Sequence, residues 1–265
     1  MKRRYGVVGL IALVFFCAAP HVYGQIFFGI TPIRAEHSGN PGESITDIFY
    51  IRNNASAPIR LRAYCENWRM LEDGTPDFIG AETTSYSCKD WIKVNPQDFR
   101  LMPNEIKTVR YTVTIPSNAQ GAGYHAAVSF ESVPDEKTPR AGSRMLLSGK
   151  IAAAVYLRVG RVPIEGDIVD VKFGQRGDST ALVLVMKNTG KTHFRTKGRI
   201  EVFDSGKKKI MDLEVPDEVV LPESEREVAC PLSKALEPGT YWAVCRLDIG
   251  RVEIVGLDKA LKVEQ

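Results

Sequence analysis

Alternation of apolar and polar residues just after the N-terminal leader constrains the fold of this chain more than any other feature. Residues 28–34, 44–53 and 59–68 alternate in this way, and residues 53–58, Asn-Asn-Ala-Ser-Ala-Pro, have the composition of a turn. A period of two places successive side chains on opposite faces of a strand. The passage therefore predicts paired β-strands with one face buried.

The pattern continues to the C-terminus and divides the chain into two halves. The first half predicts further strands at residues 92–95, 105–115, 123–131 and 145–159. After a boundary at Arg161-Val162-Pro163 the pattern restarts, with strands predicted at residues 167–173, 180–188, 197–203, 208–214, 225–230, 240–247 and 252–263. No stretch of a dozen residues keeps a helical period. We predict an all-β protein with two tandem immunoglobulin-like β-sandwich domains, at residues 25–161 and 162–265.

A secretory signal peptide is predicted at residues 1–24. Met1-Lys2-Arg3-Arg4 is basic, residues 7–16 are apolar but too few to span a bilayer, and Val22-Tyr23-Gly24 provides a cleavage site. An uncleaved N-terminal anchor is the alternative. We therefore expect a periplasmic or secreted protein with no integral membrane segment once the signal is removed.

The charge of the mature chain argues against a nucleic-acid partner. The full sequence has 35 Lys and Arg against 32 Asp and Glu. The signal peptide takes away three basic residues and no acidic one, so the two kinds balance in the mature protein. Nucleic-acid binders usually carry a basic excess, and we expect no nucleic acid among the partners.

Four cysteines remain after processing, Cys65, Cys88, Cys230 and Cys245. Their spacing matches no zinc or redox motif, and an exported protein meets an oxidising compartment. Four cysteines allow three pairings. We predict Cys65–Cys88 and Cys230–Cys245 because each pair then lies inside one domain, with free structural thiols as the alternative.

Candidates for chemistry are few. The mature chain has only His37, His125 and His193, which are scattered and suggest no metal site. Gly177-Asp178-Ser179 superficially resembles the setting of a hydrolase serine, but it lies between two predicted strands and is better explained as a turn. We expect no enzymatic activity, no metal and no cofactor.

With the strands placed, the first half resembles the PapD-like periplasmic chaperones that assemble pili. Residues 29–34, Gly-Ile-Thr-Pro-Ile-Arg, are similar to the family's first strand, where a basic residue closely follows a proline. Residues 90–113 are similar to its central strand–turn–strand passage, and residues 149–157 to the start of its last strand. The first half is also similar to the WxL-interacting cell-wall proteins, and the C-terminal half is similar to a generic adhesion-type module.

The resemblance implies a binding function with two basic site residues. Pilus chaperones grip the C-terminal carboxylate of an incomplete pilin in the cleft between their domains, and Arg34 and Lys150 match those basic positions. If so, the two side chains point the same way and lie within a few ångströms of one another. The implied partners are an exported, pilin-like subunit and an outer-membrane assembly protein.

The resemblance also implies pairing of a chaperone strand with the subunit. Only Met145 and Leu147 are large enough to fill a partner's groove ahead of Lys150, so this apolar stripe is weak. The alternative function is an envelope-associated structural or adhesion protein that uses tandem immunoglobulin-like domains as a scaffold. A secreted hydrolase has no group of residues to support it.

Overall fold

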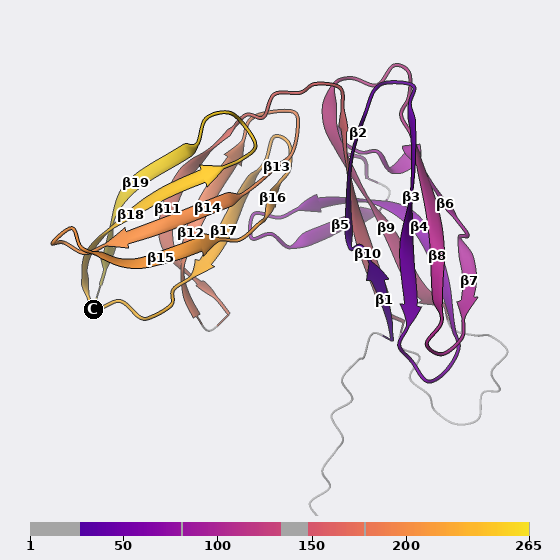
Figure 1. Ribbon diagram of the computed structural model, residues 1–265, viewed down its shortest axis with the longest axis horizontal. Coiled ribbons are helices and arrows are strands. Elements are labelled where there is room, and N and C mark those ends of the chain that lie inside the picture. The colour runs from indigo at the N-terminus through magenta and orange to yellow at the C-terminus, as the bar shows by residue number, and fades with distance from the viewer. Residues whose placement is uncertain (1–26, 81, 134–147, 178, 265) are drawn as a thin grey trace, which may run out of the picture.

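Two groups of β-strands, one from each half of the chain, make up the computed structural model (Figure 1). The structure describes residues 27–80, 82–133, 148–177 and 179–264. The elements of the first half are β1 (Phe28–Thr31), β2 (Arg34–Gly39), β3 (Ser44–Asn53), β4 (Ile59–Met70), β5 (Pro76–Gly80), the short 3₁₀ helix η1 (Lys89–Trp91), β6 (Ile92–Asn95), β7 (Asp98–Leu101), β8 (Ile106–Thr114), β9 (Ala122–Val133) and β10 (Lys150–Val159). Those of the second half are β11 (Gly166–Arg176), β12 (Ser179–Asn188), β13 (Phe194–Arg195), β14 (Lys197–Phe203), β15 (Lys209–Val215), β16 (Val219–Val220), β17 (Glu225–Pro231), β18 (Gly239–Asp248) and β19 (Val255–Val263).

The first domain is a sandwich of two sheets. One sheet has the order β1-β3-β8-β6, and the other has the order β2-β10-β9-β4-β5, with β7 also paired to β4. Alternate residues of these strands face inward, as the period of two requires. They enclose a core that includes Phe49, Ile51, Leu61, Tyr111 and Phe130.

The N-terminal strand changes sheets midway. β1 pairs antiparallel with β3, and β2 pairs in parallel with β10, with Ala154 opposite Arg34. Pro32 lies between them, and its nitrogen has no hydrogen to donate to a ladder. The single strand predicted for residues 28–34 is therefore wrong, because the chain leaves one sheet at Thr31 and joins the other at Arg34.

The second domain is also a sandwich, with its own core. Its main sheets have the orders β11-β12-β17 and β15-β14-β18-β19, and the short β13 and β16 pair with each other. The core between the sheets includes Leu182, Leu184, Met186, Ile200 and Leu247. The predicted fold class, two tandem β-sandwiches, is thus confirmed.

One buried asparagine ends β3 in the first domain, and another ends β12 in the second domain in the same way. Asn53 is fully buried and donates from Nδ2 to the carbonyl oxygens of Ala57, Leu101 and Met102. Asn188, at the end of β12, is also buried and donates to the carbonyls of Thr192 and Val220. Each side chain therefore satisfies turn carbonyls that water cannot reach.

Several predictions fall wholly or partly outside this description. The signal peptide at residues 1–24, the residues Met145 and Leu147, and the start of the strand predicted at 145–159 lie outside the described residues. In the part of the chain that the structure describes, no helix is long and apolar enough to cross a membrane.

Candidate functional site

The outer face of the β10 sheet packs against the second domain. Along β10, Val155 and Leu157 point into the first core, so Ala154 and Tyr156 point to the opposite face. Tyr156 packs there together with Trp68 and Ala127 from neighbouring strands, and with Val219 and Leu221 of the second domain. This apolar cluster, which we call the interdomain cluster, holds the two sandwiches together.

Two close backbone contacts add to the interdomain cluster. The hairpin between β4 and β5 reaches across to the second domain (Figure 1), where the Glu227 amide donates to the Glu72 carbonyl at 2.6 Å. At the other side of the interface, the Gly123 amide donates to the Lys191 carbonyl at 2.7 Å. A Cβ atom at Gly123 would lie 2.6 Å from Thr192 Oγ1, so only glycine permits this approach.

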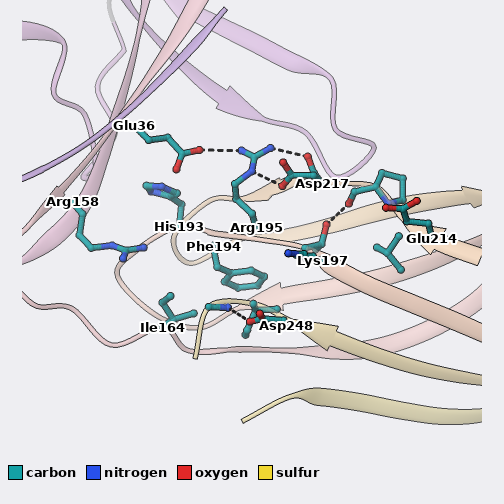
Figure 2. Close-up of a pocket in the computed structure, with 15 residues that line it drawn as sticks. Glu36, Arg158, Ile164, His193, Phe194, Arg195, Lys197, Glu214, Asp217 and Asp248 are labelled. Carbon is teal, nitrogen blue, oxygen red and sulfur yellow. Dashed lines mark hydrogen bonds and ion pairs between the residues drawn. The ribbon is translucent and has the colours of Figure 1, made fainter. Parts of the chain in front are cut away.

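A chain of four alternating charges crosses the boundary between the domains. Arg34 Nη2 lies 3.2 Å from Asp217 Oδ2, and Arg195 Nε donates to Asp217 Oδ1 at 2.6 Å. Arg195 Nη1 also lies 3.5 Å from Glu36 Oε1, and Figure 2 shows Arg195 between Glu36 and Asp217. Hydrogen bonds from Arg195, and secondarily from Arg34, lower the pKa of Asp217. We call these four residues the interdomain charge network.

Arg195 separates two cavities in the cleft, since it lines both. The larger has a volume of about 810 Å³ and contains charges of both signs, among them Arg158, Lys197, Glu214 and Asp248 (Figure 2). The smaller, of about 410 Å³, lies between the outer face of the β10 sheet and the second domain. Arg34 lines only the smaller cavity.

Arg34 and Lys150, the predicted carboxylate-binding pair, lie on one face of one sheet. Arg34 is paired with Ala154, so the two residues point to the same side, and Lys150 shares that side because it is four residues before Ala154. The same offset separates the two backbones by about 13 Å along the strand direction. The two residues therefore share a face, and the separation of a few ångströms expected between their side chains stays a prediction.

Each of the two cations already has a carboxylate neighbour. Lys150 Nζ lies 2.9 Å from Glu66 Oε1 and 4.0 Å from the ring centroid of Phe78. Arg34 contacts Asp217 in the charge network. The Lys150 and Arg34 side chains are 34% and 48% exposed, so an incoming anion can reach both.

The first part of β10 has one unpaired edge. Residues 150–159 all pair with β9, but the pairing with β2 begins at Ala154. The Ala154 amide donates to Ile33, so the Ala152 amide, two residues earlier, points to the same side. Among the described residues, no strand pairs with residues 150–153 on that side. Met145 and Leu147, the predicted strand-pairing residues, fall outside the described residues.

The structure contains neither predicted disulfide, because the thiols of Cys65, Cys88 and Cys245 are free. Cys88 belongs to the first core and Cys65 packs against it, whereas Cys230 and Cys245 are buried in the second core. Burial raises the pKa of the Cys65 and Cys245 thiols to about 12 and also raises that of Cys88. The pairing within each domain stays a prediction.

Two of the three histidines that follow the predicted signal peptide lie at the domain interface. His125 stacks edge-on against Trp68 and donates from Nε2 to the Trp68 carbonyl at 3.1 Å, and His193 packs on Tyr156. Burial lowers the pKa of each to about 4, and nearby arginines help to lower that of His193. His37 instead hydrogen-bonds to Tyr111 within the first domain. Within the described ranges, no three His, Cys, Asp or Glu side chains are placed to hold a metal ion.

Sequence reasoning missed Arg195, Asp217 and Arg226. Arg226 is 6% exposed, with Nη2 2.6 Å from Glu218 Oε2. These residues belong to the second half of the chain, where the sequence contains no recognisable site motif. Only the docking of the two domains brings them to the cleft. A buried arginine inside the alternation of β17 was the one available signal, since charged residues rarely occupy inward positions.

Comparison with known proteins finds similarity only at the level of solved structures. No protein family matches the sequence, and no curated protein is similar to it. The class 5 fimbriae chaperone CfaA is 14% identical, with 90% of this chain and 100% of that chain covered and a TM-score of 0.48. A complex of SafA pilin with the SafB chaperone from Salmonella enterica gives 17% identity, coverage of 89% and 98%, and a TM-score of 0.45. The E. coli chaperone DraB is 15% identical, with 89% of this chain and 95% of that chain covered and a TM-score of 0.44.

Proposed function

We propose that this chain is a non-enzymatic, chaperone-like protein that binds an exported, pilin-like subunit. The subunit's terminal strand would pair with the free edge of β10, and its C-terminal carboxylate would enter the cleft between the domains. The observation that carries the proposal is the unpaired edge at residues 150–153, which lies on the same strand as Lys150 and one strand from Arg34. An exposed edge offers backbone hydrogen bonds to an extended partner.

The resident ion pairs do not prevent this role. Exposed ion pairs contribute only about 0–1 kcal/mol, because water solvates both charges well. A partner's carboxylate can therefore take the place of Asp217 at Arg34 at little cost, since both members of that pair are about half exposed. Because the backbones of Arg34 and Lys150 are far apart, we expect the two side chains to contact two different groups of the partner's terminal segment rather than one shared carboxylate.

The setting of this function is also part of the proposal. We infer that the protein acts in the periplasm after signal removal and passes its subunit to an outer-membrane assembly protein. The second candidate function, an envelope scaffold, is favoured by the extent of the interdomain contacts, which keep the two sandwiches in one arrangement. The scaffold function does not explain the free strand edge beside two exposed cations, whereas the chaperone-like function does.

The test is capture of a partner by variants of the two cations. Co-purification from a periplasmic extract with mass spectrometry identifies the partner, and its C-terminal segment is then titrated as free acid and as amide. Arg34→Ala and Lys150→Ala should each weaken binding of the acid by roughly ten- to a hundredfold, the loss of a charge-assisted bond. The amide should bind the unmodified protein more weakly than the free acid does, by a similar factor.

A matched control separates this effect from a general loss of charge. Arg199 on β14 forms an exposed ion pair with Asp212 on β15, outside the cleft, so Arg199→Ala should leave binding unchanged. If Arg34→Ala with Lys150→Ala still binds the free acid at full strength, the chaperone mechanism is wrong and the scaffold function becomes the better proposal.

A further inference from the structure

The smaller cavity of the cleft is shaped for an apolar group. Its volume of about 410 Å³ falls within the usual range of ligand pockets, about 300–1,000 Å³. Much of its wall is apolar, with Trp68, Met70, Phe78 and Tyr156 among the lining residues. Figure 1 shows the strands from which these residues come, β4, β5 and β10, lying together on the side of the first domain that faces the second.

Small side chains on β10 keep this space open. Ala152 and Ala154 both line the cavity, because they lie on the outer face, whereas Ala153 points into the first core. Ala127 on β9 lines it as well. Larger residues at these positions would fill the cavity, so its volume depends on three alanines.

Two polar donors on the cavity's residues have no acceptor. Trp68 Nε1 and Arg226 Nε are buried without a hydrogen-bond partner, and their residues are only 4% and 6% exposed. Buried polar groups are nearly always hydrogen-bonded, so these two donors, which are enclosed in the free protein, favour an acceptor that binds at the cavity after a small shift of either side chain. The lining also contains Arg34, Arg195 and Arg226, each of which has an ion-pair partner, and of these Arg34 is the most exposed.

We propose that this cavity is a specificity pocket for a large apolar side chain on the C-terminal residue of the bound chain. The main-chain oxygens of that residue would accept from Trp68 Nε1 and Arg226 Nε, and its carboxylate would lie toward Arg34. This inference rests on the proposed function, since it assigns the terminal residue of the same partner. It goes further by naming the chemistry of that residue, an apolar body joined to an anion.

The test uses short peptides of one polar, β-forming sequence that differ only in the last residue. Peptides ending in Phe, Leu or Ala, each as free acid and as amide, are titrated against the full mature chain by calorimetry. The Phe and Leu acids should bind at least about tenfold more tightly than the Ala acid, as expected for burial of the larger side chain.

Two variants locate the preference in the cavity. Ala152→Phe fills the pocket and should reduce binding of the Phe acid to the level of the Ala acid. Ala260→Phe makes the same change at an exposed position of β19, outside the cleft, and should leave the preference intact. Trp68→Phe keeps a ring but removes one donor, so it should weaken all the acids by about two- to tenfold. Circular dichroism and thermal unfolding establish that each variant is folded.

The outcomes separate the inference from the proposed function. If the Phe and Ala acids bind equally while acids still bind more tightly than amides, the pocket is wrong and the carboxylate grip stands. If acids and amides bind equally, the carboxylate grip and the pocket both fail. A preference for Phe that survives Ala152→Phe in a folded protein would also overturn the pocket.

Discussion

Single buried polar side chains determine how the turns of both domains close. Asn53 and Asn188 each satisfy two or more carbonyl groups from inside a turn. The sequence indicated a turn at residues 53–58 from composition alone. It could not show that Asn53 is buried, because Asn54, the next residue, has the same chemistry and is exposed.

This difference between neighbours gives a stability prediction. Asn53→Ala should lower the free energy of unfolding by about 2–4 kcal/mol, since it leaves several buried carbonyls without a donor. Asn54→Ala, at an exposed position, should change it by less than about 0.5 kcal/mol. Urea unfolding of the two variants measures both values. Similar losses for the two would show that the buried network is not what stabilises the turn.

The interface histidines make stability depend on pH. His125 and His193 have a pKa of about 4 in the folded protein, against 6.5 when unfolded. The unfolded chain therefore binds protons first as the pH falls, so stability is full above about pH 6.5 and is lost toward pH 4. Each histidine should cost about 2 kcal/mol between pH 7.5 and 5.0.

Urea unfolding at a series of pH values tests this dependence. The variant His125→Gln with His193→Gln should lose less stability than the wild type over that interval, because only the carboxylates that both proteins share still titrate. Parallel curves for the two proteins would contradict the assignment.

The buried cysteines should be unreactive in the folded protein whether or not they pair. Thiolate is the reactive form, and burial holds the pKa of Cys65 and Cys245 near 12. Iodoacetamide should therefore label the native protein slowly. Labelling after unfolding without reductant then distinguishes thiols from bridges: four labels indicate thiols, and none indicates two disulfides, whose pairing is then read from non-reducing peptide mapping. Rapid labelling of the native protein would contradict the burial.

At the level of elements, most strands were predictable because alternation directly encodes a half-buried strand. The β3, β4, β12 and β14 segments match their predicted ranges closely. The change of sheets between β1 and β2 was not predictable, because both halves alternate in the same way and only pairing distinguishes them. β5 was missed since its few residues follow a turn and pair only with the extended end of β4.

The unpaired edge of β10 gives a prediction for backbone amides. The Ala152 amide points away from β9 toward the side without a strand partner, whereas the Ala153 amide points toward β9. Hydrogen exchange should therefore be fast at Ala152 and slow at Ala153 in the isolated protein. Binding of the partner should protect Ala152 and leave Ala153 unchanged. Fast exchange at Ala152 in the complex would exclude strand pairing at this edge.

For the whole molecule, the site depends on how the domains dock, which no local pattern reveals. Arg34 was predictable from its position after a proline, but Arg195 and Asp217 reach it from the other half of the chain. The cavity likewise needs walls from both domains. The sequence therefore predicts the two sandwiches and one or two cleft residues, and docking supplies the rest.

The close approach at Gly123 tests this docking. Gly123→Val places side-chain atoms where Thr192 already lies, so the domains should separate while both cores stay intact. Small-angle scattering should show a larger radius of gyration than for the wild type, and unfolding should become less cooperative between domains. Gly42→Ala is the control, because a Cβ there meets nothing within 4 Å, although its positive φ adds some strain. An unchanged radius for Gly123→Val would show that the interface adapts.

The contact of the β4–β5 hairpin with Glu227 also has a consequence for biosynthesis. A ribosome releases the chain N-terminus first, so β10 emerges about 70 residues before the strand that contains Glu227. Until Val219 and Leu221 also emerge, the first domain exposes Trp68, Ala127 and Tyr156 to its surroundings. A protein that we propose to shield the apolar surfaces of others thus spends part of its own synthesis with such a surface uncovered.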